Sequence, residues 1–264
     1  MRRVMGAVLA ILPLPAVAQS APQKPEREMS TDRPDKTESP YSVPAGRIQV
    51  ELDFATYTRD RERNVSIETI SAAPFNLKLG IGDSTDVQLI VQPYVHQAAT
   101  DRRTGAHATT KGFGDVVIRV KRNLWGNDEG TTAFALMPFV SLPTAKRGLG
   151  SGTVDFGLIA PLAIGLSDTI GLGLMTEVDV SGDDDGDGRT VSFINSATLS
   201  FALSERSGMY TEVFTERGDE WIVTGDLGFT YALSDETQLD AGVNVGLNDA
   251  ADAVAVFVGL SRRF

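Results

Sequence analysis

The sequence predicts an all-β protein: a transmembrane antiparallel up-and-down β-barrel of about twelve strands with an N-terminal extended arm. Three observations predict this class. From Gly46 onward, apolar residues recur with a period of two in stretch after stretch. Short, uniform turns alternate with connections of varied length. The residues opposite the apolar ones are mostly small or singly charged, which is typical of a crowded, wet barrel interior.

Residues 1–18 are expected to be a signal peptide. Met1-Arg2-Arg3 precedes an apolar run from Val4 to Val17, and Ala16-Val17-Ala18 supplies the small residues of a cleavage site. The run is interrupted by prolines and is shorter than the ~20 residues that a spanning helix needs. The sequence contains no cysteine, so disulfides cannot stabilise the exported protein. Its fold must be stable by other means, as a closed barrel would be.

Residues 19–45 are expected to be a periplasmic arm or a plug of the barrel lumen. They are rich in proline and charge and have no apolar period. The alternation of acidic and basic residues, which includes Lys36, suits charge pairing in an interior and favours the plug over a plain linker. The plug candidates are Asp32, Arg33, Asp35 and Glu38.

Residues 46–264 are expected to form the transmembrane β-barrel. The alternating stretches, with boundaries uncertain by a few residues, are 46–58, 65–80, 86–97, 113–125, 131–142, 153–166, 169–180, 190–203, 208–216, 221–233, 237–247 and 253–264. An even strand number brings both termini and all the short turns to one side, which in outer-membrane barrels is the periplasmic side. The predicted location is the outer membrane of a Gram-negative bacterium.

The barrel, rather than a soluble sandwich, follows from the chemistry of the two faces. A sheet that crosses lipid must close on itself, because each unsatisfied backbone amide in hydrocarbon costs several kcal/mol. The last stretch alternates apolar and small residues and finishes on Phe264. This pattern is typical of the signal that the outer-membrane assembly machinery recognises. Phe264 is expected to pair with the first strand between Ile48 and Phe54.

The candidate lumen-lining residues share the side of their strands opposite the apolar residues, and most are acidic. They are Glu51, Asp53, Glu68, Asp115, Arg119, Lys121, Asp155, Glu177, Asp179, Glu212, Asp226 and Asp240. As a conduit, such a lumen favours cations or neutral polar solutes over anions. Alternatively, the charges pair and fill the lumen, since ~12 strands lie between a filled barrel of ~8 and an open channel of ~16.

Other binding and catalytic sites are weakly indicated. Asp183, Asp185 and Asp187 have the spacing of the start of a calcium loop, but the twelfth position is Ile194 rather than Glu, which favours a surface loop over a metal site. The two histidines, His96 on the expected inward face and His107 in the longest connection, lack a suitable serine partner. We therefore expect no enzyme activity and no cofactor. The formal net charge of −11 argues against nucleic acid as a partner.

Two residue types bear on the position of the bilayer and on strand continuity. Aromatic residues near the expected strand ends predict interfacial girdles; they are Tyr57, Trp125, Tyr210, Trp221 and Phe264. Prolines within the expected strands cannot donate ladder hydrogen bonds and are expected at bulges; they are Pro74, Pro93, Pro138 and Pro161.

Several motifs carry a family resemblance. The runs Ser30–Pro40 and Val43–Glu51 resemble the family of the meta-pathway of phenol degradation, whose members are transporter-like outer-membrane proteins. Further matching runs are Gly112–Val116, Leu142–Thr144, Gly148–Gly152, Glu177–Asp179, Phe193–Ser196, Tyr210–Glu212 and Phe257–Ser261. The resemblance implies a barrel and aromatic or hydrophobic solutes. With the residue patterns it predicts a porin-like channel for passive uptake of small solutes across the lipid; the alternative is a non-transporting structural or adhesin-like barrel with a filled lumen.

Overall fold

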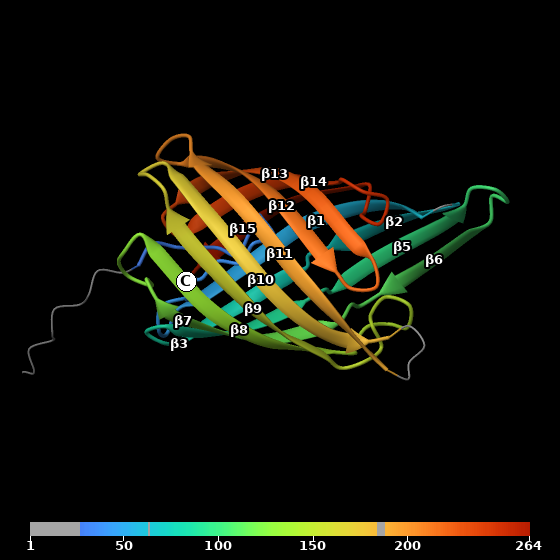
Figure 1. Ribbon diagram of the computed structural model, residues 1–264, viewed down its shortest axis with the longest axis horizontal. Coiled ribbons are helices and arrows are strands. Elements are labelled where there is room, and N and C mark those ends of the chain that lie inside the picture. Colours follow the sequence, from blue (N-terminus) through green and yellow to red (C-terminus); the bar gives the residue numbers. More distant parts are fainter. Residues whose placement is uncertain (1–26, 63, 184–187) are drawn as a thin grey trace, which may run out of the picture.

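The computed structural model describes residues 27–62, 64–183 and 188–264, which form one antiparallel sheet that closes on itself (Figure 1). β1 (Ile48–Glu62) closes the sheet by pairing with β15 (Val254–Arg263), beginning with Gln49 opposite Arg263. The Phe264 N–H donates to Ile48 O at 2.7 Å and extends this ladder by one residue. The predicted pairing of the chain end with the first strand is therefore confirmed.

Three barrel strands are each divided into two segments. β2 (Val65–Ala72) and β3 (Phe75–Gly82) both pair with β1 and follow one another along it. β4 (Thr85–Val91) and β5 (Tyr94–Asp101) form the next strand, followed by β6 (His107–Gly112) and β7 (Val116–Trp125). Because three pairs of segments count as single strands, the fifteen segments make a twelve-stranded barrel, which confirms the predicted fold class.

The remaining strands are continuous and pair in sequence order. They are β8 (Thr132–Leu142), β9 (Asp155–Gly165), β10 (Ile170–Gly182), β11 (Arg189–Ala202), β12 (Ser207–Arg217), β13 (Trp221–Ser234) and β14 (Thr237–Gly246). Figure 1 shows β9 to β13 side by side across the front of the barrel, while β5 and β6 extend to one side beyond the other strands.

The divisions explain two of the four prolines. Pro74 lies between β2 and β3, and Pro93 lies between β4 and β5, so neither has to donate a ladder hydrogen bond. Pro138 and Pro161 remain inside β8 and β9, where the register continues across them without a shift. Each division also reverses which residues face inward. Side chains alternate between the two faces of a strand, so a shift of one residue at the division moves every later side chain to the other face.

The two faces of the sheet are the inverse of those of a water-soluble domain. The exposed side chains on the outer face are large and apolar; examples are Phe54, Phe193 and Trp221. Many buried side chains are polar or charged, and Lys78 and Glu51 are only 1% and 2% exposed. A closed sheet with apolar residues outside and polar residues inside is the arrangement that lipid requires. In the part of the chain that the structure describes, no helix is long and apolar enough to cross a membrane.

Candidate functional site

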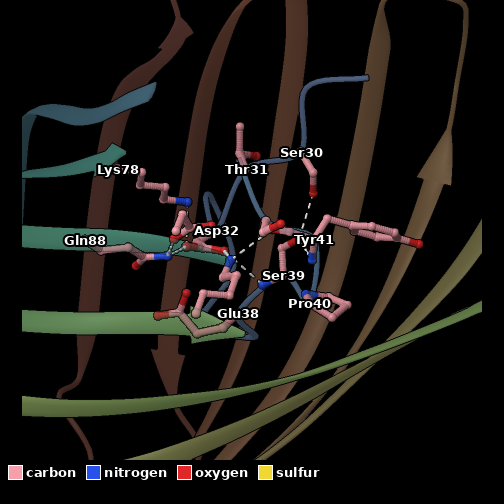
Figure 2. A network of polar contacts seen from close by, with 12 residues as sticks. Ser30, Thr31, Asp32, Glu38, Ser39, Pro40, Tyr41, Lys78 and Gln88 are labelled. Atoms are coloured by element: carbon pink, nitrogen blue, oxygen red, sulfur yellow. Dashed lines mark hydrogen bonds and ion pairs between the residues drawn. The ribbon is translucent and has the colours of Figure 1, made fainter. Parts of the chain in front are cut away.

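The arm from Arg27 to Ala45 contacts polar side chains of strands on opposite sides of the lumen. Figure 2 shows its central residue, Asp32, beside Lys78 of β3 and Gln88 of β4. The carboxylate of Asp32 pairs with Lys78 Nζ at 2.5 Å and with Lys121 Nζ of β7 at 2.5 Å. Gln88 Nε2 donates to the same carboxylate at 3.4 Å. The arm thus brings an acid to a basic part of the wall.

Glu51 completes this buried network. Its carboxylate pairs with Lys78 and accepts the Asp32 backbone N–H at 3.2 and 3.1 Å. Lys78 and Lys121 are each 1% exposed. An isolated charge in such a position would be strongly destabilising, so these two ammonium groups need their carboxylate partners.

Arg33 and Lys36 reach the opposite, acidic part of the wall. Arg33 Nη2 pairs with Asp240 of β14 and with Asp53 of β1, both at 2.6 Å. Lys36 Nζ pairs with Asp226 of β13 at 3.3 Å. The carboxylates of Asp226 and Asp240 are fully buried, and they depend on the arm for these positive partners.

Glu212 of β12 holds the backbone of the arm at the same level. It accepts the N–H groups of Lys36 and Thr37 at 2.9 and 2.8 Å. It also accepts the hydroxyl groups of Thr37 at 2.6 Å and Thr198 at 2.8 Å. A carboxylate that receives four donors from two segments fixes the arm in both position and register. Asp35 lies near Glu212 and Thr198 in this region.

The charges of the arm therefore alternate to match two walls of opposite sign. The basic wall is formed by β3 and β7, where Arg119 pairs with Glu38 of the arm. The acidic wall is formed by β12, β13 and β14. We define the contact set as the wall residues that bond to the arm and were predicted to line the lumen: Glu51, Asp53, Arg119, Lys121, Glu212, Asp226 and Asp240.

Five predicted lumen residues lie outside the contact set, and four of them are Asp115, Asp155, Glu177 and Asp179. Glu177 is near Arg119, and Asp179 Oδ1 has no hydrogen-bond partner among the described residues. Asp155 lies where β9 begins and accepts the Gly182 N–H at 3.1 Å. The carboxylate of Asp115 accepts the N–H groups of Ala145 at 2.9 Å and Ser151 at 3.0 Å, so it anchors the connection between β8 and β9.

Glu68 differs from the expectation and lies on the outer face. It accepts a hydrogen bond from the Tyr57 hydroxyl at 3.2 Å and pairs with Arg59 at 3.8 Å, and its side chain is 48% exposed. Its cross-strand neighbour on β1 is Arg59. The division between β2 and β3 reverses which residues face inward. The prediction assumed one uninterrupted strand over 65–80 and therefore placed Glu68 on the lumen face.

The same reversal between β4 and β5 places His96 outward rather than inward. His96 pairs with Ile70, which is 44% exposed on the outer face. His107 is exposed in β6, where its ring nitrogen and the Thr100 hydroxyl are 3.1 Å apart.

Tyr210 differs from the expected girdle position. It is 3% exposed, and its hydroxyl donates to the backbone oxygen of Pro34 in the arm at 3.3 Å. Gly228 lies opposite Tyr210 on β13, and a Cβ at Gly228 or Gly242 would collide with the tyrosine side chain. The two glycines thus provide the space that the ring occupies inside the barrel.

Other arm partners lie outside the predicted set. Examples are Lys78, Gln88, Asn123, Ser196 and Thr198. Lys78 had a clear signal, because Leu77 and Leu79 flank it with the opposite parity. Ser196 and Thr198 carried no such signal in the sequence, since serine and threonine are common on either face of a barrel strand.

The end of the barrel with the longer connections contains a cavity of about 1600 Å³. Acidic residues predominate in its lining, which includes Asp60, Glu216, Asp219 and Asp249. Its basic lining residues are Arg61 and Arg103. A mouth of this composition raises the local concentration of cations over anions.

At the opposite end, the turn before β14 is joined to the chain end by charge. Arg263 donates to Glu236 at 2.6 and 2.9 Å, and Arg47 pairs with the same carboxylate at 3.6 Å. The hydrogen bonds from Arg263 hold the pKa of Glu236 below its usual value. Across the described residues, no group of three or more acidic or histidine side chains is arranged to hold a metal. Asp185 and Asp187 of the calcium candidate lie outside the described residues.

These features define a class: a closed barrel with the fold of outer-membrane proteins, whose lumen holds a charged N-terminal segment. Residues 31–264 match the family described as "Putative MetA-pathway of phenol degradation", and the chain belongs to this family. This confirms the resemblance seen in the sequence. No curated protein matches the chain.

Three solved structures share the fold at low sequence identity. An outer membrane channel from Pseudomonas putida F1 is 12% identical, with 85% of this chain and 97% of that chain covered and a TM-score of 0.64. The KdgM porin in complex with disordered oligogalacturonate is 6% identical, with 83% and 99% covered and a TM-score of 0.52. The translocator domain of the autotransporter NalP from Neisseria meningitidis is 11% identical, with 84% and 90% covered and a TM-score of 0.51. Since both porins and a translocator share it, the fold alone does not define a substrate.

Proposed function

We propose that the protein is an outer-membrane channel for the passive uptake of small solutes, with its N-terminal arm as a plug of the lumen. The observation that carries this proposal is the pairing of arm charges with both walls: Asp32 and Glu38 with the basic wall, Arg33 and Lys36 with the acidic wall. Because the pairing groups belong to a terminal segment, the lumen can open without unfolding the barrel. The resemblance to porin structures supports the same role.

Cations and neutral polar solutes are the solute class that the charge distribution favours. The acidic residues of the mouth cavity supply a negative field. Aromatic or hydrophobic compounds are the class that the family description suggests. A comparison of the uptake rates of phenolic amines and phenols of equal size would separate the effect of solute charge from that of the aromatic ring.

The orientation in this proposal places both termini and the short turns in the periplasm. Short turns on that side and longer connections outside are the usual arrangement of such barrels. The pairing of Phe264 with Ile48 supports a role for the last strand as the signal for the outer-membrane assembly machinery. Replacing Phe264 by alanine should lower the amount of folded protein in the outer membrane several-fold. An unchanged amount would exclude this role.

The alternative function is a structural or adhesin-like barrel that transports nothing. It is favoured by the complete burial of the network around Lys78 and Lys121, since a permanently filled lumen would look the same. Liposome swelling distinguishes the two. Vesicles that contain the protein should swell in small cationic and neutral solutes faster than vesicles without protein, and faster than in anions of the same size. Rates equal to those of protein-free vesicles for every solute would establish the alternative.

A further inference from the structure

An arginine interrupts the apolar outer face of β9 to β13. One row of cross-strand neighbours runs from Leu158 through Val178, Phe193 and Arg217 to Trp221. Phe193 and Trp221, the two neighbours of the arginine, are 53% and 55% exposed. All of these side chains point away from the lumen, because Ile194, next to Phe193, belongs to the buried inner cluster. Figure 1 shows these five strands side by side.

Arg217 has no acidic partner among the residues that the structure describes. It is exposed and forms no ion pair with any residue that the structure describes. Its neighbour Glu216 cannot serve, because Glu216 pairs with Ile194 on the inner face. A guanidinium group among lipid-facing residues is costly unless it reaches an anion at the membrane interface. No described residue supplies this anion, so an anionic lipid headgroup is the partner that fits the position of Arg217.

A second cation lies further along the same face. Arg189 of β11 stacks over the exposed ring of Phe156 at 5.9 Å and donates to Val154 O at 2.6 Å. Arg189 lies four residues before Phe193, and Phe193 is the cross-strand neighbour of Arg217. The two arginines are therefore separated by about 13 Å along the strand direction, at a rise of ~3.3 Å per residue. Arg189 also pairs with Asp155 at 3.6 Å. A guanidinium group has five N–H donors, so these contacts leave donors of Arg189 for a further anion.

We propose that Arg189 and Arg217 form a binding site for a diphosphorylated glycolipid of the lipid A type, with one phosphate at each arginine. Guanidinium groups bind phosphate oxygens in pairs, and exposed aromatic side chains beside them suit acyl chains rather than free phosphate. The patch lies toward the longer connections, where β11 begins and β12 ends, and in the orientation proposed above this is the outer leaflet. The site depends on that orientation but not on transport.

Native mass spectrometry of the purified full-length protein tests this site. With diphosphoryl lipid A present, the wild type should retain one lipid, and Arg217→Gln or Arg189→Gln should reduce the retained fraction at least fivefold. Monophosphoryl lipid A should be retained more weakly than the diphosphoryl form by the wild type. Arg122→Gln is the matched control, because Arg122 is also exposed but lies at the opposite end of the barrel beside Thr85.

Three outcomes would overturn the proposal. Equal retention by the wild type and both variants would show that the arginines do not bind the lipid. Preferential retention of phosphatidylglycerol would place the patch in the other leaflet, and competition by inorganic phosphate alone would show an ion site without lipid specificity. Loss of a channel activity with lipid retention intact would count against the proposed function only.

Discussion

Asp32→Asn removes the negative charge that two buried lysines share. Lys78 keeps Glu51 as a partner, whereas Lys121 loses the one carboxylate that it pairs with among the described residues and keeps the neutral backbone oxygen of Tyr41 at 3.3 Å. Removing one member of a buried ion pair costs about 3–5 kcal/mol, because the other charge stays buried without compensation. If this cost falls on the docking of the arm, the docked state becomes roughly 100- to 4000-fold less favoured, at about 1.4 kcal/mol per factor of ten.

The assay is limited trypsin digestion of the folded protein, read by intact mass. Lys36 lies inside the lumen in the docked state, so cleavage after it reports the undocked fraction. The variant should be cleaved at least tenfold faster than the wild type, while a heat-modifiability gel shows an intact barrel. Asp168→Asn, in the exposed turn between β9 and β10, is the control.

Adding Lys121→Gln to the variant should restore part of the protection, because it removes the uncompensated charge. Equal cleavage of the wild type and Asp32→Asn would refute the reasoning that this carboxylate holds the arm.

Three further predictions concern single contacts. The pKa of Glu236 is lowered by Arg263, so this carboxylate stabilises the fold above its ordinary pKa and loses its contribution as the pH falls through the lowered value; Glu236→Gln should flatten the acid side of a plot of thermal stability against pH, and an unchanged curve would contradict this. Asp115→Ala should release the connection between β8 and β9, seen as new tryptic cleavage after Lys146, whereas a fragment pattern like that of the wild type would exclude an anchoring role. Gly228→Val should displace the ring of Tyr210 and cost about 1–3 kcal/mol by overpacking, lowering the temperature at which the barrel unfolds on a gel; no change would mean that the ring has another place to go.

The barrel could be predicted from the sequence because its determinants are local. A period of two is set by the strand itself, and the continuous strands β8 to β15 fall close to the expected ranges. The divided strands could not be resolved, since Pro74 and Pro93 show where a ladder hydrogen bond is missing but not that the alternation reverses there. Glu68 and His96 were placed on the wrong face for this one reason.

The contacts of the arm were predictable only in kind. Alternating charges indicated pairing in an interior, but which charge meets which wall depends on contacts far apart in the chain, such as Arg33 with Asp240. Tyr210 shows the same limit: its inward position depends on Gly228 of the next strand, which no pattern within β12 reports.

The conductance of the protein with and without its arm tests the central claim most directly. Deleting residues 19–40 removes from the lumen the arm residues that pair with Lys78, Arg119, Asp226 and Asp240, while the closing ladder from Ile48 stays intact. The proposed plug predicts a severalfold rise in single-channel conductance in planar bilayers, with cations carrying most of the current. A truncated barrel that folds and conducts no more than the full chain would contradict it.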